Sequence, residues 1–172
     1  LCSVTPAHAI LASNTSSISI TELAAATNRR NQVVGLHFFN PVPIMPLIEI
    51  VIGLDTDDET IAIGRAFGES LGKKVIVAKD TPGFIVNYLL IPYLLDAIRL
   101  VESDTASPDD IDSGMVLGCS HPMGPIKLLD FIGLDTTLFI ADVLYDAFRS
   151  ERYAAPALLR KMVAAGYMGR KS

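Results

Sequence analysis

Two apolar runs and the proline-rich link between them, Val33-Val-Gly-Leu-His-Phe-Phe-Asn-Pro-Val-Pro-Ile-Met-Pro-Leu-Ile-Glu-Ile-Val-Ile52, set the architecture of the first half of the chain. The runs have the length and the β-branched and aromatic content of strands. Pro41, Pro43 and Pro46 keep the link out of a helix and out of a sheet ladder. A parallel crossover needs about a dozen residues or more, so this shorter link predicts two antiparallel neighbours.

Strand and helix patterns mix on both sides of these runs, which indicates an α/β domain. Ser19 and Glu22 fit a capping box that opens a short helix over residues 23–27. Further apolar strands are predicted for residues 9–12 and 74–78, and an amphipathic helix for residues 57–71. After Pro82 the strand pattern stops, and helices are predicted for residues 84–102, 108–117, 124–132, 135–148 and 156–165. We therefore expect a boundary near Lys79.

The helix over residues 84–102 is apolar on almost every face as far as Leu95. The mean hydropathy of the chain is +0.40, yet prolines interrupt the two long, strongly apolar runs without charge, residues 32–48 and 81–95. Neither run reaches the roughly 18 apolar residues of a membrane-spanning helix. A helical half of this size is too small to bury such a helix alone, so we expect a homodimer through this half and no membrane span.

Charge and cysteine content exclude several function classes. The chain has 14 Lys and Arg against 19 Asp and Glu, and its net charge is −5 with no basic block. This argues against nucleic-acid binding, which needs a clustered cationic face. Cys2 and Cys119 lack the spacing of a disulfide framework or a zinc site. We expect both to be free buried thiols, and we expect no metal.

His37 and Glu49 are the two polar side chains that stand out in the paired apolar runs. An ionised carboxylate in an apolar strand is costly unless it has a partner. A His–Glu pair would supply that partner and would orient the imidazole for acid–base catalysis. The alternatives are a histidine satisfied in the core and an edge-strand glutamate that faces water.

Three further polar residues are candidates for ligand contacts. Asn87 is the strongly polar side chain between Phe84 and Leu95. Its amide either makes a hydrogen bond in helix packing or donates one to a substrate carbonyl. Asn14 and Ser16 lie in the polar loop after the first strand, where ordinary loop chemistry is the alternative to ligand binding.

Four stretches, in this order, closely resemble one family, the L-3-hydroxyacyl-CoA dehydrogenases, and in particular the short-chain 3-hydroxybutyryl-CoA type. They are Ala12-Ser-Asn-Thr-Ser-Ser17, Gly35-Leu-His-Phe-Phe-Asn-Pro-Val-Pro43, Lys79-Asp-Thr-Pro-Gly-Phe-Ile-Val-Asn87, and Pro122-Met-Gly-Pro125 followed by Gly133-Leu-Asp-Thr-Thr137. The resemblance covers nearly the whole chain and corresponds to the C-terminal part of the family.

The resemblance implies NAD-dependent oxidation of a 3-hydroxyacyl-CoA to the 3-ketoacyl-CoA in fatty acid metabolism. It implies that His37 is the catalytic base and that Glu49 orients it. It further implies an incomplete Rossmann-type NAD-binding domain over residues 1–79 and an all-helical dimerisation and substrate domain over residues 80–172. The remaining implied contacts are substrate binding by Ser16, Asn40 and Asn87, and cofactor binding by Asn14 and Ser16.

One departure from the family is large. The first strand, the Gly-x-Gly-x-x-Gly turn and the acidic residue for the ribose are not in this sequence, which corresponds to on the order of 100 residues. We therefore expect a fragment or a truncated product. NADP stays an alternative to NAD, because the residues that contact the ribose are missing, and the acyl chain length is open.

A second hypothesis is a truncated, non-catalytic module that dimerises and binds acyl-CoA or has a structural role. Retention of His37, Glu49 and Asn87 favours the dehydrogenase, because such a module has no need of a buried carboxylate. The chain starts at Leu1 without a basic segment, so no secretory signal is visible. The resemblance then implies the cytoplasm of a bacterium, or the mitochondrial matrix of a eukaryote.

Overall fold

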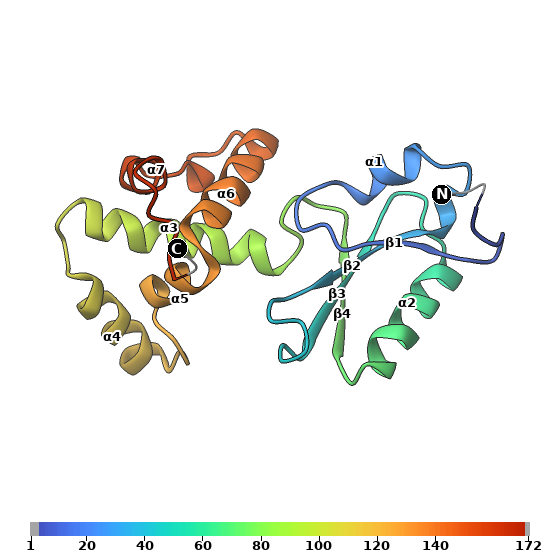
Figure 1. Cartoon of the computed structure of the whole chain (residues 1–172), viewed down its shortest axis with the longest axis horizontal. Coiled ribbons are helices and arrows are strands. Elements are labelled where there is room, and N and C mark those ends of the chain that lie inside the picture. The colour runs from blue at the N-terminus through green and yellow to red at the C-terminus, as the bar shows by residue number, and fades with distance from the viewer. Residues whose placement is uncertain (1–3, 171–172) are drawn as a thin grey trace. The chain divides into compact units, whose positions relative to one another are not determined.

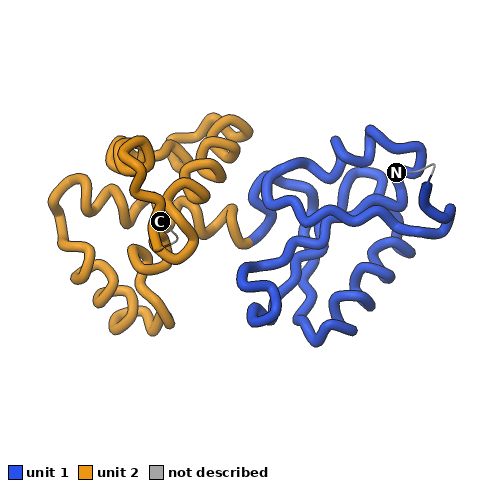
Figure 2. The backbone as a smooth tube through the Cα atoms, viewed as in Figure 1, with its two compact units in different colours: residues 1–85 blue, residues 86–172 orange. Residues whose placement is uncertain are grey.

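The structure, a computed structural model, describes residues 4–170. The chain divides into two compact units, residues 1–85 and residues 86–172 (Figure 2). The first unit is built on a four-stranded sheet in the order β1 (Leu11–Ser13), β2 (Val33–Phe38), β3 (Leu47–Ile52) and β4 (Lys74–Lys79). β1 and β3 run parallel to β2 and β4, respectively, and β2 and β3 are antiparallel, as the short proline-rich link predicts.

Helices cover both faces of this sheet (Figure 1). α2 (Asp58–Ser70) packs so closely on one face of the sheet that a Cβ on its Gly68 would lie 2.8 Å from Cγ2 of Val75 in β4. α1 (Ile20–Ala25) packs on the opposite face, where a Cβ on Gly35 would lie 3.0 Å from Cδ1 of Ile20. A short 3₁₀ helix, Arg30–Gln32, leads into β2. Side chains alternate between the faces of a strand, so His37 lies on the same face as Gly35, which is the face that α1 covers.

The second unit contains helices and no strand in its described residues, as predicted. Its core is formed by apolar side chains from four of its helices, with Leu94, Ala141, Leu144 and Leu159 fully buried. A short 3₁₀ helix, Glu151–Tyr153, completes it. The helices are α3 (Val86–Glu102), α4 (Pro108–Cys119), α5 (Pro125–Ile132), α6 (Leu134–Phe148) and α7 (Ala157–Ala164).

The start of α3 differs from the prediction. The sequence pattern places the helix start at residue 84, whereas α3 begins at Val86. Gly83 has φ 80° and Phe84 has φ 52°, so residues 81–84 form a turn with left-handed backbone in place of helix. The division between the units also lies later than Lys79, since residues 80–85 belong to the first unit.

The burial of α3 bears on the dimer argument. Ile91, Leu94 and Leu95 are between 0% and 1% exposed, and they pack in the core of their own unit. The unit therefore buries these three side chains itself, but it does not bury every apolar side chain of the helix. Leu89, on the same helix, is 59% exposed.

Two smaller expectations can be compared with the structure. Cys119 is exposed at the end of α4, so the expectation of a buried thiol is wrong for it, and Cys2 lies outside the described residues. Within residues 4–170, no helix combines the length and the hydrophobicity that a membrane crossing requires.

Candidate active site

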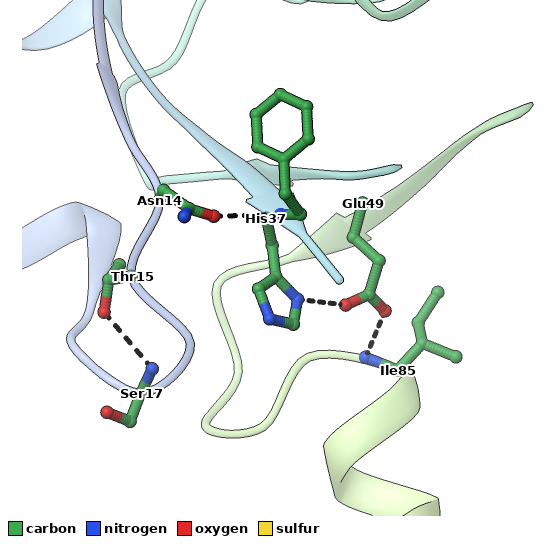
Figure 3. Close-up of polar contacts among 7 residues, drawn as sticks. Asn14, Thr15, Ser17, His37, Glu49 and Ile85 are labelled. Carbon is green, nitrogen blue, oxygen red and sulfur yellow. Dashed lines mark hydrogen bonds and ion pairs between the residues drawn. The ribbon is translucent and has the colours of Figure 1, made fainter. Parts of the chain in front are cut away.

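His37 and Glu49 form a buried pair between the two antiparallel strands that the sequence singles out. The register places them directly opposite each other in β2 and β3, and His37 Nδ1 lies 2.6 Å from Glu49 Oε2 (Figure 3). His37 is 5% exposed and Glu49 is 0% exposed. The alternative of an edge glutamate facing water is therefore wrong, and the two side chains are held by the sheet that carries them.

The second oxygen of the Glu49 carboxylate also accepts a hydrogen bond. The backbone N–H of Ile85 donates to Glu49 Oε1 at 3.1 Å. A buried carboxylate needs such partners, because an unpaired one loses its hydration without compensation. The imidazole itself packs against two aromatic rings, Phe39 with a centroid separation of 4.6 Å and Phe84 with one of 5.4 Å.

This arrangement fixes the tautomer of the imidazole. A carboxylate accepts hydrogen bonds and does not donate them, so the hydrogen shared by the pair is on Nδ1 of His37. The lone pair of the neutral ring is then on Nε2, which makes no hydrogen bond to any of residues 4–170. A histidine held in this way can accept a proton at Nε2, while the nearby carboxylate stabilises the cation that forms.

The loop after β1 lies beside the end of β2. The backbone N–H of Phe38, the residue after His37, donates to Asn14 Oδ1 at 2.9 Å. Thr15 Oγ1 accepts from the backbone N–H groups of Ser17 and Ile18 at 3.2 and 2.7 Å. In the view of Figure 3, Glu49 lies on one side of the His37 ring and this loop on the other.

Two polar groups at this end of the sheet make no hydrogen bond within residues 4–170, so they are available to a ligand. Ser16 is half-buried in the loop, and its hydroxyl makes no hydrogen bond within residues 4–170. His37 Nε2 is likewise free within the described chain. In open α/β sheets, ligands bind outside the carboxyl ends of the strands, which is where β1 and β2 end here.

The two remaining predicted residues lie on other elements of the chain. Asn40 is exposed at the start of the loop between β2 and β3. Lys73 anchors that loop, because its Nζ donates to the carbonyl oxygens of Val42 and Met45 at 2.7 and 2.8 Å. Asn87 is buried in the first turn of α3, in the second unit.

Asp80 is a residue of this region to which sequence analysis assigned no role. Its carboxylate accepts from the Ser19 hydroxyl at 2.6 Å and from the backbone N–H groups of Ile20 and Thr21 at 3.0 and 2.8 Å. Burial raises the pKa of Asp80, but the hydrogen bonds from Ser19, Thr21 and Ile20 outweigh it and hold the pKa below its usual value. Ser19 caps α1 as predicted, by accepting from the N–H of Glu22. The sequence signal for Asp80 was an acidic residue placed directly before a Thr-Pro-Gly turn.

Comparison with known proteins assigns both parts of the chain to one family. Residues 1–81 match the 3-hydroxyacyl-CoA dehydrogenase NAD binding domain, and residues 83–172 match the 3-hydroxyacyl-CoA dehydrogenase C-terminal domain. The chain therefore belongs to the 3-hydroxyacyl-CoA dehydrogenase family. The predicted fold class, a Rossmann-type domain followed by a helical domain, is confirmed.

Individual relatives are similar over nearly the whole chain. A 3-hydroxybutyryl-CoA dehydrogenase of Mycobacterium tuberculosis H37Rv is 51% identical over 170 residues, which are 98% of this chain and 59% of the relative. The human mitochondrial hydroxyacyl-coenzyme A dehydrogenase is 50% identical over 167 residues, which are 96% of this chain and 53% of the relative. The crystal structure of (S)-3-hydroxybutyryl-CoA dehydrogenase PaaH1 from Ralstonia eutropha matches with a TM-score of 0.95 and 50% identity, over 98% of this chain and 60% of that one. The chain thus spans somewhat more than half the length of these proteins.

Proposed function

We propose that the protein carrying this chain is an NAD-dependent dehydrogenase that oxidises (S)-3-hydroxyacyl-CoA to 3-ketoacyl-CoA. The preferred substrate in this proposal is 3-hydroxybutyryl-CoA. The observation that carries this proposal is the buried His37–Glu49 pair. Nδ1 of His37 is hydrogen-bonded to the carboxylate, and Nε2 makes no hydrogen bond within the described chain. The names of the relatives support the substrate class. The family model for residues 1–81 supports NAD as the cofactor.

In the proposed reaction, His37 Nε2 takes the proton of the 3-hydroxyl group. Glu49 holds the ring in the required tautomer and stabilises the imidazolium during the step. A bound NAD would supply the acceptor for the hydride that leaves C3. General base catalysis of this kind contributes about 10² to 10⁴ in rate.

Four asparagine and serine side chains are proposed to bind the reactants. Asn14 and Ser16 stand in the loop at the end of β1, where they are proposed to hold the nicotinamide end of the cofactor. Ser16 is also proposed to contact the substrate oxygen. Asn40 and Asn87 are proposed to position the catalytic centre and the substrate carbonyl, because an amide offers both a donor and an acceptor.

The test is a steady-state assay of the whole protein that carries this chain, with acetoacetyl-CoA and NADH as reactants and NADPH in a parallel series. We expect NADH to be consumed. His37→Ala should abolish most of that activity, whereas His8→Ala, which changes an exposed histidine of the same unit, should be fully active. A parent protein that consumes neither NADH nor NADPH would contradict the proposed activity and favour a non-catalytic module.

We also propose a homodimer through the helical unit. Several large apolar side chains of this unit are exposed, including Leu117 at 83% and Phe139 at 61%. Burying apolar surface is worth about 25 cal/mol per Å², which favours association of such faces. Sedimentation velocity of Phe139→Asp, with the exposed change Asp146→Asn on the same helix as control, is expected to show a monomer for Phe139→Asp alone.

A further inference from the structure

The loop that carries Ser16 is fixed to the rest of its unit at both ends. At its start, Asn14 Oδ1 accepts from the N–H of Phe38, the neighbour of His37. At its end, the Ser19 hydroxyl donates to Asp80 Oδ2 at 2.6 Å, and Ile20 N–H donates to Asp80 Oδ1. The position of the loop therefore depends on a carboxylate that comes from the other end of the unit.

Asp80 is also the first residue of the segment that reaches Glu49. Its own N–H donates to the carbonyl oxygen of Ile52 at 2.9 Å, at the end of β3. The chain then turns, with Phe84 N–H donating to the Thr81 carbonyl at 2.8 Å. This turn places the Phe84 ring against His37 and the Ile85 N–H on Glu49.

We propose that Asp80 is a positioning residue of the active site, whose carboxylate fixes the Ser16 loop and the 81–85 turn relative to each other. Through the turn it sets the hydrogen bond from Ile85 to Glu49, and through Glu49 it sets the orientation of His37. This inference rests on the proposed function, because it assigns Asp80 to the reaction in which His37 is the base.

The three donors that meet at Asp80 explain why a carboxylate is needed. The Ser19 hydroxyl and the N–H groups of Ile20 and Thr21 all point at its two oxygens. An asparagine has one acceptor oxygen, and its amide NH₂ would face at least one of these donors. Asp80→Asn therefore keeps the shape of the side chain and breaks part of the connection between the loop and the turn.

Asp57 provides a matched control. It caps α2 in the same unit, where Oδ1 accepts from Thr60 N–H at 2.8 Å and Oδ2 accepts from the Asn31 side chain at 2.7 Å. Hydrogen bonds lower its pKa below the usual value, as they do for Asp80, with that from Thr60 N–H contributing most. Asp57→Asn therefore makes the same carboxylate-to-amide change at the start of another helix, where it replaces the acceptor for Asn31 by a donor, without touching the loop or the turn.

The experiment compares Asp80→Asn with Asp57→Asn in two measurements. Both are made at a temperature below the melting temperatures of the two variants, so that both are folded. The first is NMR of the full chain, which follows the Ile85 amide and the His37 ring nitrogens. The second is steady-state oxidation of 3-hydroxybutyryl-CoA by the whole protein. We expect both variants to melt earlier than the parent. Asp80→Asn alone should shift the NMR signals and lower kcat by about tenfold or more, because a displacement of about 1 Å can cost on the order of 10²-fold.

The outcomes separate positioning from stability. Parent-like NMR signals and kcat in Asp80→Asn would overturn the proposal, and so would an equal loss of kcat in both variants. If the parent oxidises no 3-hydroxyacyl-CoA, the proposed function fails, and the NMR comparison alone still decides whether Asp80 sets the geometry at Glu49 and His37.

A second pair of variants covers the case in which Asp80→Asn does not fold. Ser19→Ala removes one donor to Asp80 and the cap of α1. Ser107→Ala removes the equivalent cap of α4, where the hydroxyl accepts from Asp110 N–H. Only Ser19→Ala should shift the Ile85 and His37 signals, and unchanged signals in Ser19→Ala would count against the proposal.

Discussion

Glu49→Gln tests the core of the site, because it keeps the size of the side chain and removes one of two acceptors. In the parent, Oε2 lies 2.6 Å from His37 Nδ1 and Oε1 accepts from Ile85 N–H at 3.1 Å. A glutamine has one acceptor and one donor group for these two positions. If its oxygen faces His37, the NH₂ group faces the Ile85 N–H. If the oxygen faces Ile85, the NH₂ group donates to Nδ1 and the ring proton moves to Nε2.

In the second orientation, each of the two contacts pairs one donor with one acceptor. This orientation is therefore favoured. Leaving a buried backbone N–H unsatisfied costs about 1–3 kcal/mol. That free energy corresponds to a factor of about 5 to 150 in population. The base-competent tautomer is therefore reduced by this factor, and kcat falls with it. Loss of the anion beside the imidazolium adds to the effect, so we expect a total loss of about 10² to 10⁴ in kcat.

The assay combines steady-state oxidation of 3-hydroxybutyryl-CoA with ¹⁵N NMR of the His37 ring, which distinguishes the two tautomers. Glu69→Gln is the matched control, since Glu69 is exposed on α2 and is expected to give parent-like results in both measurements. A parent-like kcat in Glu49→Gln would refute the catalytic role of the carboxylate. A ring that keeps its proton on Nδ1 would refute the tautomer argument.

Three further predictions follow from single contacts. His37→Ala should lower kcat by about 10² to 10⁴ with an unchanged fold, measured by steady-state rates and circular dichroism; near-normal turnover would remove it as the base. Gly35→Ala should destabilise the first unit by about 1–3 kcal/mol in urea unfolding, because the new Cβ would lie 2.7 Å from Val51 Cβ; Gly114→Ala, which meets nothing within 4 Å, should not. Burial acts to raise the pKa of Asp80, but hydrogen bonds at the start of α1 lower it below its usual value. The advantage of the parent over Asp80→Asn in melting temperature should therefore be full at neutral pH and fade as the pH falls below about 4; a pH-independent difference would contradict this.

The sequence predicted the sheet and the contact between His37 and Glu49 because both depend on local patterns. The apolar runs around residues 33–38 and 47–52 and the prolines between them imply antiparallel pairing, and pairing alone brings His37 opposite Glu49. The helices after Pro82 follow from periodicity and caps in the same way. The start of α3 was placed too early, because the apolar pattern of residues 84 and 85 continues that of the helix. The left-handed backbone at Phe84 leaves no mark on hydropathy.

The second hydrogen bond to Glu49 shows where sequence reasoning reaches its limit. Its donor is the backbone N–H of Ile85, a group that every residue except proline possesses, so no side-chain pattern indicates it. What the sequence does contain is the set of residues that bring this N–H into place, namely Asp80, the Thr-Pro-Gly turn and Phe84. Each has an ordinary structural interpretation when taken alone. Their common purpose becomes visible only when the turn, α1 and the His37–Glu49 pair are seen to share one hydrogen-bonded network.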